Sequence, residues 1–364
     1  MIVHKTSEEL LREIEELSSL IRFQYKRKDA EAKQNILSLL NALEQLIQLS
    51  ADRFLSLDVE GYLPAEEEEQ QRSEFIVHPD DLLRAKDYSA SILLKLISTE
   101  ISFPDNKQDE DENESRMERA SRILAHMSGR GAAGSITRIW HIPYLNDNGE
   151  KEELLLPLHE PCYVGNDLGF KTWGAAPMMA KKLLQNNIIP HICDCTVLEI
   201  GTGTGMVGIV CDYLGAAEVH MTDYHPRVIE NVSYNIHLNN SRAQVSKLDF
   251  IKLAKKGTAD EEEKDDAQSE IVDNGRQYDI VIASDLLYEL EHAEYLPPAI
   301  NKLAKNEFYF MIPLRETHWE EVRHFESKMD SLNQFLLRKV EDLEKEDEEE
   351  GLIKFRYYEY VRIK

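Results

Sequence analysis

The sequence predicts an α/β protein in which a helical N-terminal module precedes a parallel sheet covered on both faces by helices. Apolar residues recur at helical spacing through residues 1–130, and short apolar strands alternate with helical patterns from Thr196 onward. A glycine-rich turn joins one of these strands to the helix after it. With 364 residues, 42% of them hydrophobic, the chain has material for two buried cores. We expect domains at 1–130 and 136–364.

The first third of the chain is expected to be helical. Thr6 and Glu9 have the spacing of a capping box, as do Ser115 and Glu118. The apolar positions at helical spacing are Leu10, Ile14, Leu17, Ile21, Ile36, Leu40, Leu43, Ile47, Leu82, Leu83, Leu93, Leu94, Ile97, Ile123 and Met127. No motif for chemistry occurs here, so we interpret residues 1–130 as a packing or partner-docking module.

The formal net charge of −26 is concentrated in four acidic runs, at 66–74, 105–114, 257–275 and 341–350. We interpret these runs as solvated loops and linkers, with 105–114 as a flexible linker and 257–275 as a disordered surface loop. The sequence shows no basic stripe for gripping phosphates, which argues against direct, sequence-independent nucleic-acid binding.

Other features bear on the compartment. The four cysteines are too few and too irregularly spaced for a disulfide framework, and no apolar run approaches the ~20 residues of a membrane span. The N-terminus becomes charged too early for a signal peptide. Because histidines and cysteines lack zinc spacing, no metal is expected. These features predict a cytoplasmic protein that does not bind membranes.

The remaining strands and helices follow in order. Residues 136–145 and 153–159 form β-rich segments joined by the turn sequence NDNG. Further strands are expected at 196–200, 218–222, 244–248, 278–284 and 308–314, and helices at 206–214, 226–238, 297–304 and 316–328. A last alternating strand, 353–363, is expected as an antiparallel edge or hairpin strand.

The glycine turn is the main candidate for chemistry. In the segment 197–208 (VLEIGTGTGMVG), Gly201, Gly203 and Gly205 let the backbone pass close under a ligand and turn into a helix. Asp223 closes the next strand, 22 residues after Gly201, where a carboxylate can hold a ribose diol. A strand, a glycine turn, a helix and this acid together predict nucleotide binding.

The type of nucleotide follows from charge. Read from Gly203, the turn satisfies G-x-G-x-x-G, so a nicotinamide cofactor must be considered. However, the strand ends at Ile200, and in that register the third fingerprint position is Met206 rather than glycine. Glu199 at the mouth of the turn repels a diphosphate but suits a cofactor that carries an ammonium and a sulfonium. The turn therefore favours S-adenosyl-L-methionine.

At this point the sequence resembles a known family. In order and spacing, four segments are similar to motifs of seven-strand S-adenosylmethionine methyltransferases, namely 199–205 (EIGTGTG), 222–224 (TDY), 248–250 (LDF) and 283–288 (ASDLLY). They most resemble methyltransferase family 16, whose members are mostly protein-lysine methyltransferases. The resemblance covers residues 136–364 and implies a Rossmann-like seven-strand sheet with an N-terminal β-hairpin.

Three further segments resemble the fungal members of this family that act on translation elongation factors two and three. They are 156–161 (LPLHEP), 167–174 (DLGFKTWG) and 312–315 (IPLR). The resemblance therefore implies a protein substrate, namely a translation elongation factor. With no basic stripe in the sequence, no direct nucleic-acid partner is expected.

The resemblance also implies which residues bind the cofactor. Gly201, Thr202, Gly203 and Gly205 correspond to the loop under the methionine moiety, and Glu199 to the position that holds its amino group.

The ribose and adenine are assigned to the next strands. Asp223 corresponds to the ribose ligand and Tyr224 to an adenine contact. Asp249 and Phe250 belong to the adenine side, although the family usually has tryptophan in place of Phe250. Trp173 falls where the family places a tryptophan beside the cofactor. Trp173 and Phe250 could instead be ordinary core residues.

Ser284 and Asp285 begin the D-x-x-Y element at the substrate mouth, and Tyr288 ends it. The family often has alanine in place of Ser284. We assign Asp285 and Tyr288 the task of holding the substrate nitrogen in line with the methyl carbon. Tyr288 could instead only cap the turn into the next helix.

Two other functions remain open from the sequence. One is N-methylation of a small amine or a nucleic acid, although the N-P-P-[YF] element of many base methylators is replaced here by DLLY. The other is a non-catalytic scaffold that retains the cofactor fold. The intact glycines and Asp223 argue against loss of the cofactor site.

Overall fold

The computed structural model describes residues 5–24, 29–58, 77, 79–98, 100–101, 107–128, 134–162, 171–256, 275–347 and 351–363. The chain divides into two compact units, which we call the helical unit and the sheet unit. The helical unit comprises Met1–Phe54, Glu60–Ile139 and Pro161–Gly165, and the sheet unit comprises Leu55–Val59, Trp140–Glu160 and Asn166–Lys364. The predicted loops at 66–74 and 257–274 lie outside the described residues.

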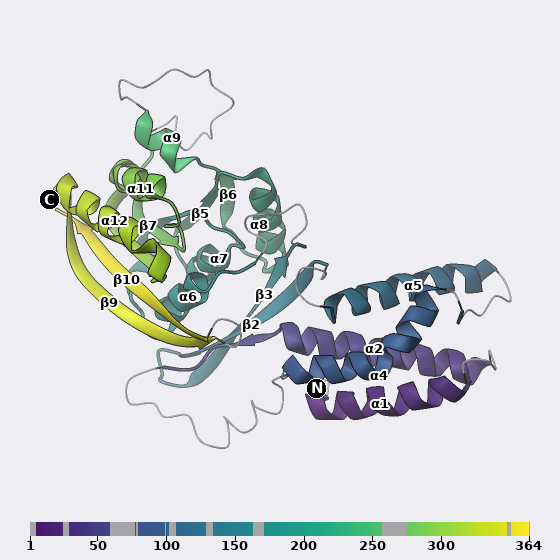
Figure 1. The fold of residues 1–364 in the computed structure, drawn as a ribbon. Coiled ribbons are helices and arrows are strands. Elements are labelled where there is room, and N and C mark those ends of the chain that lie inside the picture. The colour runs from purple at the N-terminus through teal and green to yellow at the C-terminus, as the bar shows by residue number, and fades with distance from the viewer. Residues whose placement is uncertain are drawn as a thin grey trace. The chain divides into compact units, whose positions relative to one another are not determined.

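The helical unit contains α1 (Ser7–Gln24), α2 (Ala30–Ala51), the short strand β1 (Arg53–Phe54), α4 (Pro79–Ile97) and α5 (Lys107–His126) (Figure 1). The predicted capping box at the start of α1 is confirmed, since Thr6 N–H donates to Glu9 Oε2 (2.9 Å) and Glu9 N–H donates to Thr6 Oγ1 (3.2 Å). The helices share one apolar core that includes Leu10, Ile14, Ile36, Leu40, Leu93 and Ile123. Leu83 and Leu94 of α4 share the apolar helical spacing but are exposed.

Helix α5 corrects two predictions. It begins at Lys107, so most of the acidic run 105–114 is helical rather than a flexible linker. Ser115 and Glu118 therefore lie inside a helix and do not start one. Lys, Gln and Glu favour helix, and carboxylates near a helix N-terminus are stabilised by the helix dipole.

The predicted hairpin consists of β2 (Ile136–Leu145) and β3 (Lys151–Glu160), and it belongs to the sheet unit from Trp140 onward. Gly149 N–H donates to the Asn146 carbonyl (2.8 Å), and Asn146 Oδ1 accepts from the N–H groups of Asn148 and Glu150, each at 3.0 Å. Gly149 has a φ of 77°, which glycine adopts without strain.

A seven-stranded sheet follows, in the order β6-β5-β4-β7-β8-β10-β9. Its parallel strands are β4 (Thr196–Ile200), β5 (Glu218–Asp223), β6 (Gln244–Lys247), β7 (Tyr278–Ser284) and β8 (Ala304–Pro313). β10 (Gly351–Arg362) pairs antiparallel with β8, and β9 (Phe335–Asp347) pairs antiparallel with β10 at the edge. The predicted parallel sheet is confirmed.

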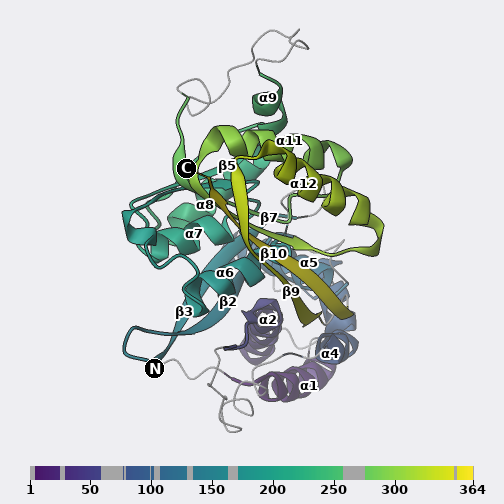
Figure 2. The ribbon, with the colours of Figure 1, turned by 90° about the vertical axis from the view of Figure 1, so that its left-hand side faces the viewer.

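Helices cover both faces of this sheet (Figure 2). The core on one face includes residues of α6 (Ala175–Gln185), α7 (Met206–Tyr213) and α8 (Pro226–Leu238). The core on the other face includes residues of α9 (Phe250–Lys255), α11 (Leu290–Leu303) and α12 (Trp319–Leu332). Short 3₁₀ turns occur at Ile192–Asp194 and Glu316–His318. Val197 and Leu198 of β4 point to opposite cores, as neighbours in a strand must.

Two predictions fail at the C-terminal half. Strand β9 includes the first residues of the acidic run 341–350, which was expected to be a loop. Its charges are compatible with an edge strand because they pair across to β10, as Asp342 does with Arg356 and Glu344 with Lys354. Helix α11 begins at Leu290 rather than at Pro297, which lies inside the helix although proline usually marks a helix start.

Candidate active site

The glycine turn connects β4 to α7 at the carboxyl edge of the parallel strands. Gly201, Gly203 and Gly205 all have positive φ, between 56° and 91°, a region that is costly for residues with a Cβ. Thr202 N–H donates to the Thr222 carbonyl in β5 (3.0 Å), which ties the turn to the neighbouring strand. The turn is therefore anchored to β5 through its backbone.

The glycines differ in what surrounds them. A Cβ at Gly201 would lie 2.0 Å from Leu286 Cδ1, so packing against the loop after β7 requires glycine there. A Cβ at Gly203 meets no atom within 4 Å. The backbone of Gly203 thus borders open space, as a backbone that passes under a ligand should.

Glu199 is buried below the turn, with 1% of its surface exposed. One carboxylate oxygen accepts hydrogen bonds from Thr202 Oγ1 (2.5 Å) and from Gly208 N–H (3.0 Å). Burial raises the pKa of the Glu199 carboxyl to about 8, and the negative charge of Asp223 adds to the shift. A cationic group of a ligand near this carboxyl would favour its ionised form.

Asp223 is the last residue of β5 and lies against the turn. Its carboxylate accepts a hydrogen bond from His225 N–H (3.0 Å), and the N–H groups of Gly203 and Tyr224 also favour its ionised form. Burial nevertheless raises the pKa of Asp223 above its ordinary value. Tyr224 is 47% exposed, so its ring is available to a flat ligand group. Asp223 and Tyr224 therefore lie next to each other at the edge of the glycine turn, and their contacts with ribose and adenine stay a prediction.

Asp249 and Phe250 follow β6 at the same edge. Asp249 caps α9, because its Oδ1 accepts from the N–H groups of Ile251 (3.1 Å) and Lys252 (3.0 Å). Phe250 is buried, and its ring lies 5.7 Å from that of His292 on α11. Asp249 thus has a structural role, and Phe250 belongs to the core while forming one side of an aromatic cluster.

Ser284 and Asp285 lie at the end of β7. Ser284 is buried. Asp285 has a φ of 53°, which is rare for a residue other than glycine and is typical of functional turns. Its backbone N–H donates to the Met311 carbonyl in β8 (2.9 Å), and its Oδ1 lies 3.6 Å from Arg315 Nη1. Two strands therefore fix this carboxylate and supply a cation beside it.

Tyr288 completes the D-x-x-Y element and is 37% exposed. Its ring meets that of His292 edge to face, with centroids 4.5 Å apart. Partial burial raises the pKa of the Tyr288 hydroxyl, and the charges of Asp223 and Asp285 add to the rise. Tyr288 therefore lies within electrostatic reach of both carboxylates and stays protonated at neutral pH.

Trp173 precedes α6, and its ring is covered by Lys171 Nζ at 4.3 Å. The adjacent Thr172 connects this segment to the glycine turn, since Thr172 Oγ1 lies 2.8 Å from Thr204 Oγ1. Thr172 N–H also donates to Glu160 Oε1 (2.9 Å). The neighbouring residues 167–170 of the predicted motif lie outside the described part of the chain.

The structure brings most of the predicted residues to one edge of the sheet, at the carboxyl ends of β4, β5, β6 and β7. Sequence reasoning missed two neighbours, Arg315 and His292. Arg315 ended the quoted segment IPLR but was given no role, and no sequence signal places His292 between two aromatic rings. Among the described residues, no group of three or more His, Cys, Asp or Glu could hold a metal ion. In the same part of the chain, no helix is long and apolar enough to cross a membrane.

The fold and this edge define an α/β protein of the methyltransferase type. Open space above Gly203, the carboxylate of Asp223 and the exposed ring of Tyr224 fit the methionine, ribose and adenine parts of S-adenosylmethionine. A profile of the lysine methyltransferase family matches residues 151–331.

Two protein-lysine methyltransferases agree with this match. Protein-lysine N-methyltransferase rrg1 of Schizosaccharomyces pombe is 31% identical over 246 residues, 66% of this chain and 74% of that protein. Protein-lysine N-methyltransferase EFM2 of Saccharomyces cerevisiae is 26% identical over 281 residues, 67% of this chain and 58% of that protein. Among solved structures, that of SMU.776 complexed with SAH is 11% identical, with a TM-score of 0.42, over 72% of this chain and 67% of that chain. The chain belongs to the lysine methyltransferase family, and its cofactor is S-adenosylmethionine.

Proposed function

We propose that this protein is a cytoplasmic protein-lysine N-methyltransferase whose substrate is a translation elongation factor. The observation that carries the proposal is the position of Asp285 and Tyr288. Both lie at the carboxyl edge of the sheet beside the glycine turn, and the charge of Asp285 acts on the Tyr288 hydroxyl. The catalytic domain is assigned to residues 136–364, and residues 1–130 form a separate helical module.

In this proposal, each part of the cofactor has a partner in the chain. Gly201, Thr202, Gly203 and Gly205 cradle the methionine moiety, with Glu199 near its amino group. Asp223 binds the ribose hydroxyls.

The adenine is assigned to Tyr224 and to the Asp249–Phe250 side of the site, and Trp173 is assigned a position beside the cofactor. Ser284 is also assigned to cofactor binding. The bound cofactor supplies a methyl group that its sulfonium has already activated.

The enzyme then needs the nitrogen of the substrate lysine in its uncharged form. A lysine ammonium cannot attack, so its proton must first leave to solvent, and partial burial beside aromatic rings lowers the lysine pKa. Tyr288 and the nearby ring of His292 provide such surroundings. Asp285 attracts the incoming cation and then orients the nitrogen, so its role is positioning rather than chemistry on the methyl group.

The choice of an elongation factor rests on the segments 156–161, 167–174 and 312–315, which resemble the family members acting on elongation factors two and three. Of these segments, 312–315 reaches the candidate site directly, because Arg315 forms an ion pair with Asp285.

The test is methyl transfer with labelled S-adenosylmethionine. The full chain is incubated with purified elongation factors two and three, and separately with a lysate from cells that lack the protein. We expect label on one factor and methyllysine in its peptides by mass spectrometry, with the Asp285→Asn variant as control. Label only on small amines or nucleic acid would replace the proposal with the corresponding alternative. Cofactor binding without transfer to any acceptor would favour the scaffold.

A further inference from the structure

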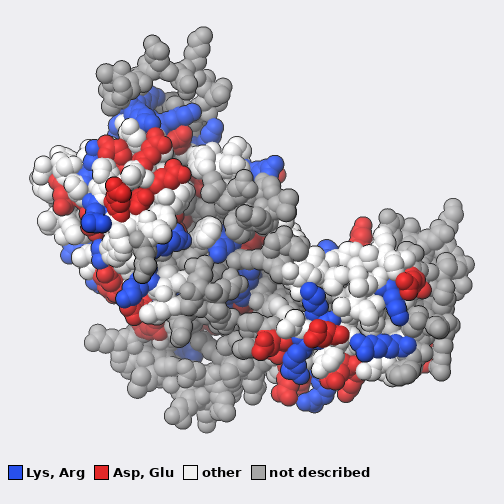
Figure 3. Space-filling view, viewed as in Figure 1, with Lys and Arg blue, Asp and Glu red and all other residues white. Residues whose placement is uncertain are grey.

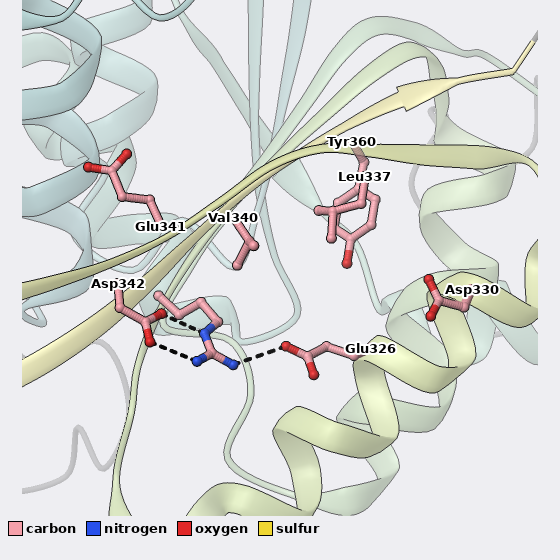
Figure 4. A pocket seen from close by; sticks show the side chains of 8 residues that line it. Glu326, Asp330, Leu337, Val340, Glu341, Asp342 and Tyr360 are labelled. Atoms are coloured by element: carbon pink, nitrogen blue, oxygen red, sulfur yellow. Dashed lines mark hydrogen bonds and ion pairs between the residues drawn. The ribbon is translucent and has the colours of Figure 1, made fainter.

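A groove outside the active site runs between α12 and the β9–β10 hairpin of the sheet unit, and we call it the α12–β9 groove. It encloses about 560 Å³. The residues that matter for its chemistry are Glu326, Asp330, Leu337, Val340, Asp342 and Arg356. Figure 4 shows these side chains converging from the helix and the two strands on one space.

The groove has an excess of negative charge. Its cation, Arg356, is already neutralised, because Nε and Nη2 bind the two Asp342 oxygens (2.6 and 2.7 Å) and Nη1 lies 3.2 Å from Glu326 Oε1. Asp330 is exposed and has no ion pair within the described part of the chain. Two carboxylates fully engage Arg356, so Asp330 adds uncompensated charge.

Acidic side chains also gather on the neighbouring surface. Figure 3 shows them over α11 and α12, with lysine and arginine interspersed. The excess negative charge inside the groove attracts positively charged groups from a distance. The groove is therefore suited to a basic partner and poorly suited to an acidic one.

The floor of the groove is apolar. Leu337 and Val340 of β9 are 40% and 50% exposed, although both side chains lie on the sheet face that carries α12. Tyr360 of β10 is paired with Leu337 across the strands and is buried beneath them. An exposed apolar strip rimmed by carboxylates is typical of a surface that binds a partner.

We propose that the α12–β9 groove docks a basic, amphipathic segment of the protein substrate, separate from the lysine that is methylated. The inference rests on the proposed function, because it takes the partner to be the protein substrate. Apolar side chains of the segment cover Leu337 and Val340, and its lysines or arginines meet Asp330 and the acidic rim. Docking of this kind raises the local concentration of the target lysine without contributing to the chemical step.

The test uses a fluorescent peptide of alternating lysine and leucine, and a second peptide in which glutamate replaces lysine. Binding to the full chain is measured by anisotropy without S-adenosylmethionine, so that the result does not depend on methyl transfer. We expect the lysine peptide to bind with higher affinity than the glutamate peptide. We also expect its affinity to fall at high salt.

Two matched pairs of variants locate the binding. Asp330→Lys removes a groove carboxylate, and Glu320→Lys changes an exposed carboxylate on the same helix outside the groove. Val340→Asp changes the apolar floor. Leu336→Asp changes an exposed position on the opposite face of β9, because Leu336 pairs with Val361 whereas Val340 pairs with Tyr358. We expect each groove variant to weaken binding at least about fivefold and each control to stay within about twofold.

For a protein substrate, the same groove variants should raise KM and leave kcat and cofactor affinity unchanged. The inference would be overturned if the control variants lost as much peptide affinity as the groove variants. It would also be overturned if the lysine and glutamate peptides bound equally well. A dimer in sedimentation that Val340→Asp dissociates would also overturn it, by assigning the groove to a second copy of the chain. Normal peptide binding with no methyl transfer would contradict the proposed function alone.

Discussion

Asp285 Oδ1 lies 3.6 Å from Arg315 Nη1, so a carboxylate after β7 and a guanidinium after β8 meet at the carboxyl edge of the sheet. Asp285 is largely buried, whereas Arg315 is partly exposed. A buried carboxylate is costly unless a cation accompanies it. Arg315 supplies that cation, and in the proposed mechanism the substrate ammonium must approach the same carboxylate.

Asp285→Asn tests the role of this carboxylate. The change keeps the size of the side chain but removes its charge, so the lysine nitrogen is no longer held in line. We expect turnover to fall by ~10²-fold or more while S-adenosylmethionine affinity stays within about threefold. Tyr288→Phe should lower turnover in the same direction by less. If Asp285→Asn instead abolishes cofactor binding and spares turnover at saturating cofactor, the residue belongs to the cofactor pocket.

Arg315→Met tests whether the guanidinium acts through Asp285. Loss of the cation leaves the Asp285 carboxylate less firmly oriented, so turnover should fall while cofactor affinity is retained, and Arg315→Lys should restore part of it. Because the two side chains are in contact, we expect the double variant with Asp285→Asn to be non-additive by at least ~0.5 kcal/mol in transition-state free energy. Strictly additive losses would show that Arg315 contributes independently.

Much of the sheet could be predicted because each parallel strand is a short apolar run with a turn signal after it. β4 and β7 begin and end at the expected residues. The prediction failed where charge was taken as evidence against regular structure. The acidic run at the start of α5 is helical, and in β9 Asp342 and Glu344 pair across to Arg356 and Lys354 of β10. Composition alone does not reveal such partners.

The same limit applies to the site. Gly201, Asp223 and Asp285 could be proposed from the sequence because each stands at the end of a strand or directly after it, where spacing along the chain is enough. His292 lies in the first turn of α11, before the residue at which the sequence predicted this helix to begin. Arg315 follows β8, and nothing in the sequence indicated a role for it. Their contacts with Asp285 and Tyr288 depend on how β8 and α11 pack, which is a property of the folded chain.

Asp223→Ala tests the cofactor assignment. In the proposed assignment this change removes a charged group that binds two ribose hydroxyls, so S-adenosylmethionine affinity should fall by ~1.5–3 kcal/mol in calorimetry. The melting temperature without cofactor should change much less than the affinity. Binding of NADH, or an unchanged affinity for S-adenosylmethionine, would contradict the assignment.

Gly203→Ala and Gly201→Ala should separate binding from folding. A Cβ at Gly201 collides with Leu286, so Gly201→Ala should lower the melting temperature strongly. At Gly203 the Cβ meets open space, and only the positive φ costs stability, on the order of 1–2 kcal/mol. We expect Gly203→Ala to remain folded by circular dichroism but to lose cofactor affinity. Retained affinity in this variant would mean that the methionine moiety does not pass over Gly203.

Glu199 gives a pH dependence whose sign can be worked out. In the unfolded chain its pKa takes the ordinary value of 4.5, whereas burial raises the folded value to about 8. The folded protein therefore binds more protons between these values, and the free energy of unfolding must fall as pH rises from 4.5 to 8. Glu199→Gln keeps the hydrogen-bond acceptor for Thr202 and Gly208 but cannot ionise. Denaturant unfolding at pH 5 and pH 8 should show wild type losing stability relative to Glu199→Gln at the higher pH. If the stability of the two proteins changes equally between pH 5 and pH 8, Glu199 is already ionised in the folded protein at pH 5. The carboxylate that is proposed to attract the cofactor ammonium would then be charged before the cofactor binds.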